Sequence, residues 1–375
     1  MEGQKGLGTS KWDLETPCLV IDEEVLDQNI RVMQAHVKSF GKQLRPHAKT
    51  HKCTKIAGKQ MAAGCVGICV AKVSEAEVLV EKGFRKILIT SPLGADGKIQ
   101  RFLECVARAP ELMGVVDSSA GARRLNEAGE GRSQPINVLL DLDPGMGRTG
   151  IPFREALDLG IHIHRLPFLQ LRGVQCYAGH VQHISSFQER EKTSLKWMHQ
   201  AADLFRKFRE SGLPGEILTG SGTGTFDIDC RVSELTDLQT GSYTLMDAEY
   251  LSIGSSLDPS RFVQFPPALT LLTTVISANH SDFVTVDAGL KALYHHGATP
   301  TVIHPAGSDL TYEWWGDEHG KIRMNHGGRK PLIGEVIELA VSHCDPTVNL
   351  FDAFHVIREG ILTDIWPIDM RGRCQ

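Results

Sequence analysis

Strand-like and helix-like segments alternate along the first two thirds of the chain. Short apolar or β-branched runs occupy residues 18–21, 43–47, 67–71, 86–90, 112–116, 136–142, 171–177 and 216–219, and helix-like segments follow most of them. Regular alternation of this kind predicts a parallel sheet, because each helix returns the chain to the same edge. Eight such units over about 240 residues favour a closed α/β barrel, the (β/α)8 or TIM type, over the alternative of an open doubly wound sheet.

The pattern changes after Tyr250. Strand-like runs at residues 266–278, 283–286, 301–303 and 336–341 are separated by Gly, Asn, Asp and Pro and not by helices, which favours a separate β domain. A chain of 375 residues also exceeds what one hydrophobic core usually supports. We therefore predict a barrel over residues 16–255 and a β domain over residues 256–375, onto which residues 1–15 pack.

The composition is that of an ordinary globular protein and excludes several classes of function. A net charge of −5 and a pI near 6.3 give no reason to expect nucleic acid as a partner. The most apolar stretch, residues 61–71, is far shorter than the ~20 residues that span a membrane, and residues 1–16 are polar. Nine cysteines without a CxxC pair argue against a disulfide framework and for a reducing compartment, so we expect a cytoplasmic protein.

Residues 45–52 read RPHAKTHK and gather two lysines, two histidines and an arginine at the end of a predicted strand. A lysine surrounded by positive charge loses part of its preference for the protonated form, and a neutral amine attacks a carbonyl carbon. The segment is therefore typical of an enzyme that forms a Schiff base through a lysine. A solvated basic turn is the alternative when this segment is taken alone.

Two glycine-rich segments also follow predicted strands. Residues 220–225 read GSGTGT, where closely spaced glycines and hydroxyls favour a phosphate site over a merely flexible turn. Residues 145–150 read GMGRTG, the spacing of a dinucleotide fingerprint, but residues 165–175 lack the acidic side chain that this fingerprint requires. We interpret the second segment as a turn that brings Arg148 to the barrel mouth, where it can hold an oxyanion, or that leaves it on a solvated loop.

Two further groups of polar residues follow predicted strands. Tyr177, His180 and His183 end the predicted seventh strand, where an aromatic ring can stack on a flat cofactor and an imidazole can act as a general base. His343 and Asp345 follow residues 336–341, and an extended segment would point both to one side. Imidazole plus carboxylate suits Mn²⁺, Mg²⁺ or Zn²⁺ and leaves positions for water and substrate, although surface pairs of this kind without a metal are common.

Seven segments, in order, resemble the D-threonine aldolase and D-serine dehydratase family, enzymes dependent on pyridoxal 5′-phosphate (PLP) with an alanine-racemase-like fold. The segments are TPCLVID (16–22), RPHAKTHK (45–52), DPGMGRTG (143–150), GSGTGT (220–225), GSYTLMD (241–247), GDEHG (316–320) and HCDPTVNL (343–350). The resemblance extends over nearly the whole chain. The resemblance implies a PLP-binding barrel, a C-terminal β domain that carries metal ligands, and a homodimer whose subunits complete each other's sites.

The resemblance also implies roles for individual residues. By position, Lys49 is the lysine that binds PLP, and Lys52 is a neighbouring charge. The residues that would hold the phosphate or contact the cofactor ring are Gly220, Ser221, Gly222, Thr223, Arg148, Tyr177 and Tyr243. His343 and Asp345 match the family's metal pair, for which we expect Mn²⁺, with Mg²⁺ or Zn²⁺ as alternatives.

The metal pair bears on the reaction. The dehydratase members more often have cysteine where this chain has Asp345, and a carboxylate makes a harder site that suits Mn²⁺ or Mg²⁺. We therefore expect an aldolase that cleaves small β-hydroxy-D-amino acids such as D-threonine and D-allo-threonine to glycine and an aldehyde. The metal would lower the pKa of the substrate hydroxyl, and His180 or His183 would take its proton.

Three alternatives remain. A dehydratase acting on D-serine or D-threo-3-hydroxyaspartate would use the same lysine and metal. A racemase is weaker, because it does not need the metal pair. A non-catalytic PLP-binding protein is the alternative from a different functional class, and the β domain together with His343 and Asp345 argues against it.

Overall fold

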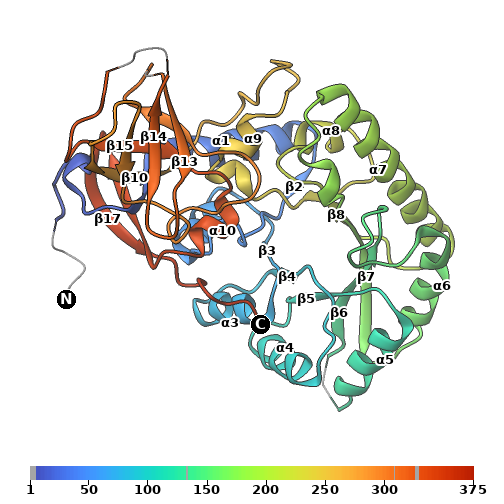
Figure 1. Ribbon diagram of the computed structural model, residues 1–375. Coiled ribbons are helices and arrows are strands. Elements are labelled where there is room, and N and C mark those ends of the chain that lie inside the picture. Colours follow the sequence, from blue (N-terminus) through green and yellow to red (C-terminus); the bar gives the residue numbers. More distant parts are fainter. Residues whose placement is uncertain (1–5, 132–133, 308, 326–328) are drawn as a thin grey trace. The chain divides into compact units, whose positions relative to one another are not determined.

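The structure is a computed structural model that describes residues 6–131, 134–307, 309–325 and 329–375 (Figure 1). It divides into two compact units. The barrel unit comprises Arg31–Lys49, Ile56–Gly241 and Gly372–Gln375, and the β unit comprises the described residues of Met1–Ile30, Thr50–Lys55 and Ser242–Arg371. Residues 1–5, which we expected in the β domain, lie outside the described residues.

Eight parallel strands form the barrel. They are β2 (Gln43–Leu44), β3 (Ile68–Val70), β4 (Ile87–Ile89), β5 (Met113–Val116), β6 (Ile136–Leu142), β7 (Leu169–Cys176), β8 (Ile217–Gly220) and β9 (Asp237–Leu238). Their order is β2-β9-β8-β7-β6-β5-β4-β3. The two ends of this sheet meet where His47, just beyond β2, forms a parallel bridge to Cys69 of β3. The predicted fold class of a closed α/β barrel is confirmed.

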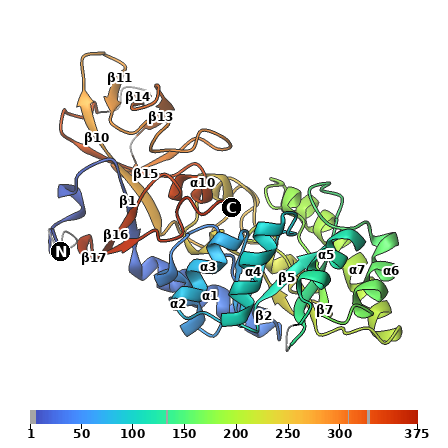
Figure 2. The ribbon, with the colours of Figure 1, turned by 90° about the horizontal axis from the view of Figure 1, so that it is seen from below.

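Helices follow the barrel strands and lie outside them (Figures 1 and 2). They are α2 (Thr54–Ala62), α3 (Val73–Glu81), α4 (Asp96–Arg108), α5 (Ser119–Ala128), α6 (Phe153–His164), α7 (Phe187–Glu210) and α8 (Phe226–Asp229), with the 3-10 turn η2 (Gly179–Val181) before α7. The helix α1 (Glu23–Ser39) instead follows β1 (Cys18–Asp22), which is not a barrel strand. Ser118 caps α5 by accepting a hydrogen bond from the Gly121 amide, and Ser186 caps α7 by accepting one from the Glu189 amide. Within the described residues, none of the helices is both long enough and apolar enough to cross a membrane.

One predicted barrel strand belongs to the other unit. Cys18–Asp22 (β1) pairs with two strands of the β unit, whereas the eighth barrel strand is the two-residue β9. A strand followed by a helix has the same local pattern in either place, so only long-range pairing decides where β1 lies. The strand β9 escaped prediction because it is too short to show a periodic pattern.

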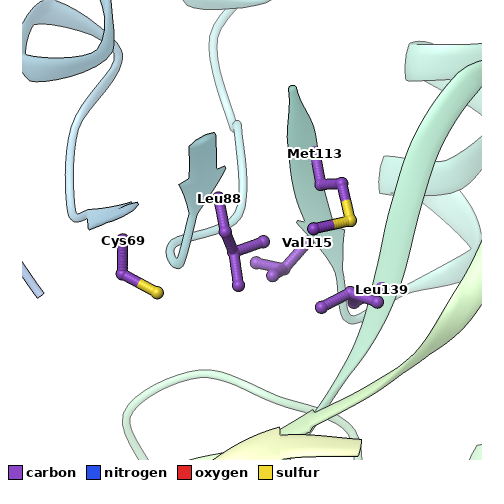
Figure 3. Packing of buried hydrophobic residues seen from close by; sticks show 5 residues of the cluster. All are labelled: Cys69, Leu88, Met113, Val115 and Leu139. Atoms are coloured by element: carbon purple, nitrogen blue, oxygen red, sulfur yellow. The ribbon is translucent and has the colours of Figure 1, made fainter. Parts of the chain in front are cut away.

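The barrel interior has an apolar layer. Its members come from neighbouring strands, with Ile217 of β8 packed against them, and Figure 3 shows the buried five: Cys69, Leu88, Met113, Val115 and Leu139. Strand β8 is not adjacent to β3, β4, β5 or β6, so these side chains meet inside the barrel. Filling of this kind makes the barrel a packed core and leaves its functional groups at one end.

The β unit is built on one nine-stranded sheet. Its strands are β1 (Cys18–Asp22), β10 (Leu269–Ser277), β11 (Phe283–Val286), β12 (Thr301–His304), β13 (Leu310–Trp314), β14 (Gly320–Met324), β15 (Val336–Ala340), β16 (Ala353–Arg358) and β17 (Ile361–Pro367). Among the described strands of this sheet, β1 and β16 pair in parallel and the other pairs are antiparallel. The unit also contains η1 (Lys11–Asp13), η3 (Ser242–Thr244), α9 (Ala248–Leu251) and α10 (Cys344–Val348). An apolar cluster of Cys18, Val20, Leu272 and Ile357 holds β1 in this sheet.

Candidate active site

Lys49 follows the first barrel strand at the carboxyl end of the barrel. The preceding residues are fixed by two backbone hydrogen bonds of 2.8 Å, from the Ala48 amide to the Cys69 carbonyl and from the Cys69 amide to the Pro46 carbonyl. The Lys49 amide donates to Nδ1 of His47 at 3.3 Å, and Nε2 of His47 lies 3.1 Å from the Thr90 hydroxyl. Because Nδ1 accepts, Nε2 carries the proton and donates to Thr90. The half-buried Lys49 is therefore held at a defined place on the barrel rim.

The RPHAKTHK segment does not belong to one unit. Residues up to Lys49 lie in the barrel unit, whereas Thr50–Lys55 lies in the β unit. Lys52 is buried, adopts a left-handed backbone conformation with φ of 47°, and accepts a hydrogen bond from the Met370 amide through its carbonyl. The two lysines of the motif thus have different surroundings, and the structure distinguishes Lys49 as the one on the barrel rim.

The predicted phosphate loop follows β8, and it leaves the sheet through Ser221, whose φ of 68° is left-handed. A Cβ atom on Gly222 would lie 2.5 Å from Oε1 of Gln182, and one on Gly224 would lie 2.1 Å from the Gln182 carbonyl oxygen. Because the neighbouring atom at Gly224 is backbone, only glycine fits there, whereas a Cβ atom on Gly222 would require the buried Gln182 side chain to move. Ser221 and Thr223 are also buried, so the loop presents hydroxyls and backbone amides in a tight curl of the kind that binds anions.

Two buried polar side chains, Gln182 and Arg190, form hydrogen bonds with this loop. The Gln182 side chain accepts a hydrogen bond from the Gly224 amide at 3.0 Å and donates to the Thr225 hydroxyl at 3.1 Å. The fully buried guanidinium of Arg190 on α7 donates to the carbonyls of Gly224 and Ile184. The hydrogen bonds from Gln182 and Arg190 thereby fix the Gly224–Thr225 end of the loop.

Lys49 and the phosphate loop lie at the same edge of the barrel. Both follow the carboxyl ends of parallel strands, β2 and β8, and each of these strands pairs with β9. A single strand therefore separates the candidate cofactor lysine from the candidate phosphate site. This is the end at which barrel enzymes place their chemistry.

A layer of buried polar side chains lies inside the barrel. The Gln175 amide donates to Asp141 at 2.7 Å and to the Thr90 carbonyl at 3.1 Å, and its oxygen accepts from Gln239 at 3.1 Å. Thr90 follows β4, which is not adjacent to β7, so the Gln175–Thr90 bond crosses the interior. His47 reaches the same Thr90, and the layer thereby connects to the segment that carries Lys49.

The polar layer ends in a buried ion pair. Gln239 donates to the Thr219 hydroxyl at 3.2 Å, and Thr219 donates to the carboxylate of Asp237. Asp237 in turn accepts from Nε of Arg45 at 3.3 Å. Burial alone lowers the pKa of the Arg45 guanidinium, but the Asp237 carboxylate outweighs burial and raises that pKa. No sequence pattern reveals this layer, because its members are single polar residues on strands that are otherwise apolar.

The residues expected at the barrel mouth differ in exposure. The guanidinium carbon of Arg148 lies 5.7 Å from the centre of the Tyr177 ring, so these two side chains come together. His180 is exposed on η2, and His183 is partly buried just after it. Both histidines belong to the loop that Gln182 fastens to Gly224. Arg148 is exposed, and its contact with the cofactor ring stays a prediction.

Tyr243 lies in the β unit on η3. It is completely buried, and its ring packs edge-on against Phe265 with centroids 5.7 Å apart. Its role as a cofactor contact stays a prediction from the resemblance.

The predicted metal pair lies in the β unit at the start of α10. His343 has extended backbone angles, but the helix begins at Cys344, so Asp345 lies in the first helical turn and not on an extended strand. The expected extended geometry is therefore wrong, although the Asp345 carboxylate still lies near enough to the imidazole to raise the pKa of His343. Burial lowers the pKa of His343, but the hydrogen bond to Asp247 and the nearby carboxylates outweigh burial and raise the pKa to about 9.

The donor set at His343 fits a divalent cation of intermediate hardness, because it offers one imidazole and one carboxylate. Across the described ranges, no group of three or more His, Cys, Asp or Glu side chains is arranged to hold a metal. A metal held by His343 and Asp345 would need water or substrate to complete its coordination.

Comparison with known proteins defines the class. Residues 21–246 match the family described as "Alanine racemase, N-terminal domain", and residues 268–357 match the "Putative serine dehydratase domain". The chain is 36% identical to a D-threonine aldolase of Arthrobacter sp., over 96% of this chain and 93% of that one. It is 31% identical to a 3-hydroxy-D-aspartate aldolase of Paracoccus denitrificans (strain Pd 1222), over 98% and 94%. The crystal structure of D-threonine aldolase from Filomicrobium marinum superposes with a TM-score of 0.93 at 33% identity, and each chain is covered completely.

The fold and the two matched regions define an alanine-racemase-like barrel enzyme with an additional dehydratase-type domain. The chain belongs to the D-threonine aldolase and D-serine dehydratase family, as its motifs predicted. PLP is the cofactor of this family. The residues of the barrel unit fit that group, because the glycine cradle after β8 has no room for Cβ atoms and Lys49 lies one strand away.

Proposed function

We propose that the protein is a PLP- and divalent-metal-dependent lyase that cleaves β-hydroxy-D-amino acids such as D-threonine and D-allo-threonine to glycine and an aldehyde. The observation that carries the proposal is the placement of Lys49 and the Gly220–Thr225 loop at one edge of the barrel, with β9 between their strands. Similarity to two aldolases at 36% and 31% identity supports the choice of reaction.

Each residue has a stated task in this proposal. Lys49 would hold PLP covalently, and the amides and hydroxyls of Gly220, Ser221, Gly222 and Thr223 would hold its phosphate. PLP supplies, when bound, an acceptor for the electrons of the bond that breaks at the substrate Cα. His180 or His183 would take the proton from the substrate β-hydroxyl oxygen. His343 and Asp345 would hold the metal, with Mn²⁺ as the expected ion.

Product analysis tests the reaction. Purified protein supplied with PLP and Mn²⁺ is incubated with D-threonine and, separately, with L-threonine as the stereochemical control. We expect glycine and acetaldehyde from the D-isomer only. Formation of 2-oxobutanoate and ammonia would instead establish the dehydratase, which the match of residues 268–357 to a serine dehydratase domain makes the second candidate. No turnover of any β-hydroxy-D-amino acid by PLP-loaded protein would leave the binding-protein alternative.

Two further predictions concern assembly and location. None of the nine cysteines forms a disulfide, and eight of them are buried, which suits the reducing cytoplasm that we expect. A homodimer, which the family resemblance implies, would be tested by light scattering of the purified protein. Elution at the mass of a single 41.2 kDa chain would contradict it.

A further inference from the structure

Asp247 ends the GSYTLMD segment and has no role in the proposed reaction so far. Its carboxylate is completely buried, and Oδ2 lies 2.9 Å from Nδ1 of His343. The two residues are distant in sequence, and both belong to the β unit. A buried carboxylate placed against the imidazole of a candidate metal ligand is an arrangement that orients such ligands in metalloproteins.

Backbone amides fix the Asp247 carboxylate on both of its oxygens. Oδ1 accepts from the Tyr250 amide at 3.0 Å, which makes Asp247 the N-cap of α9, and Oδ2 accepts from the Cys344 amide at 2.9 Å. The carboxylate therefore cannot turn without breaking a hydrogen bond to each of two segments. Its position is set by the fold and not by the histidine.

The segments that carry the two residues are also joined to each other. The Ala248 amide donates to the Val341 carbonyl at 2.9 Å, and the Glu249 amide donates to the Ser342 carbonyl at 3.1 Å. The Cys344 thiol donates to the Met246 carbonyl at 3.1 Å. These hydrogen bonds fix the position of the segment around Asp247 relative to the segment around His343.

The direction of the His343 hydrogen bond follows from this arrangement. An ionised carboxylate only accepts, so Nδ1 of His343 carries the proton and donates to Asp247. A neutral imidazole with its proton on Nδ1 presents the lone pair of Nε2, and metal ligation by this ring occurs there. We infer that Asp247 is a positioning residue for the metal, which selects the Nδ1–H tautomer of His343 and aims Nε2 at the cation. The inference rests on the metal role proposed above for His343.

Glu249 provides a matched comparison on the same helix. Its Oε2 lies 3.3 Å from Nδ1 of His343, but its side chain is 25% exposed, whereas that of Asp247 is inaccessible. Both carboxylates add negative charge near the imidazole. Of the two, Asp247 is the one fixed by the Tyr250 and Cys344 amides. If only negative charge near the imidazole matters, neutralising either residue should weaken metal binding to a similar extent. If orientation of the imidazole matters, neutralising Asp247 should weaken it more.

The test measures Mn²⁺ binding directly by the electron paramagnetic resonance signal of the free ion, with PLP-loaded protein. Removal of a carboxylate that orients a metal-bound histidine typically weakens metal binding by about 10–100-fold, and we expect this loss for Asp247→Asn. Asparagine has a single acceptor oxygen in its side chain. It therefore cannot accept both from the Tyr250 amide and from His343, as the two oxygens of Asp247 do. Glu249→Gln should weaken binding by at most about fivefold, the scale of an exposed ion pair.

Asp247→Ser is the second variant, because a serine hydroxyl can still cap α9 but is too short to reach His343. We expect it to lose Mn²⁺ affinity as Asp247→Asn does, while both keep the visible absorbance of bound PLP. Wild-type affinity for Mn²⁺ in folded Asp247→Asn and Asp247→Ser would overturn the inference and leave the proposed function intact. If wild-type protein binds no Mn²⁺, or binds it equally well after His343→Ala, the proposed metal role fails and the inference fails with it.

Discussion

Replacement of Asp237 by asparagine should destabilise the barrel unit strongly, although the two side chains have nearly the same shape. Asp237 is 3% exposed and its partner Arg45 is 6% exposed, so water cannot compensate a charge left on Arg45. At the Nε–Oδ1 distance of 3.3 Å and an effective dielectric constant of about 20, the pair interacts with roughly 5 kcal/mol. Removal of one partner from a buried pair costs about 3–5 kcal/mol, because the other charge stays buried.

The assay is scanning calorimetry of the wild type and the Asp237→Asn variant. A unit of about 200 residues loses roughly 2–4 °C of Tm for each kcal/mol, so we expect a fall of about 6–20 °C. The control is Asp96→Asn, whose carboxylate pairs with Arg124 at 2.6 Å but whose side chain is 87% exposed. Such surface pairs contribute about 0–1 kcal/mol, so this variant should stay within about 4 °C of the wild type.

A double variant separates the loss of charge from the loss of shape. Arg45→Met combined with Asp237→Asn removes the uncompensated cation and should recover much of the Tm lost by Asp237→Asn alone. Our reasoning would be refuted if Asp237→Asn were no more destabilising than Asp96→Asn, or if the double variant were less stable than Asp237→Asn.

Three further predictions concern the cofactor, the metal and pH. Lys49→Ala should abolish the visible absorbance band of lysine-bound PLP and Lys52→Ala should keep it; the reverse pattern would exclude Lys49. Exhaustive chelation should remove activity and added Mn²⁺ should restore it, whereas full activity of the chelated enzyme would contradict a metal role. Burial raises the pKa of Asp141 to about 6 against the hydrogen bonds from Gln175 and Thr149. The folded protein therefore holds this proton more tightly than the unfolded chain does, and this group should lower stability as pH rises from about 4 through about 6. Asp141→Asn should flatten the plot of Tm against pH in that window, and an unchanged slope would show that Asp141 does not titrate there.

Much of the fold could be predicted from the sequence because barrel strands and helices have clear local patterns. The runs that became β3, β4, β5 and β6 are short and almost wholly apolar, as buried parallel strands are. The assignment of β1 to the barrel was wrong because pairing partners are not encoded locally. The strand β9 was missed because its residues, Asp237 and Leu238, form no recognisable run.

The candidate site was predictable where a motif carries its chemistry in consecutive residues. Lys49 and the Gly220–Thr225 loop stand out as segments, and the structure brings both to one barrel edge. The polar layer from Asp141 to Arg45 could not be found in this way, because each strand contributes only one or two of its members. Asp247 lies in the GSYTLMD segment (241–247), but its contact with His343 could not be predicted, because the fold brings together two segments that are distant in sequence.

The most direct test of the proposed reaction follows the hydrogen on the substrate Cα. An aldolase breaks the Cα–Cβ bond and leaves that hydrogen in place, whereas a dehydratase must remove it. With D-threonine deuterated at C2, the protein should release glycine that retains the deuterium at early time points, at a rate without a primary isotope effect. Loss of the deuterium, with 2-oxobutanoate as the product, would contradict the proposal that this family member is an aldolase.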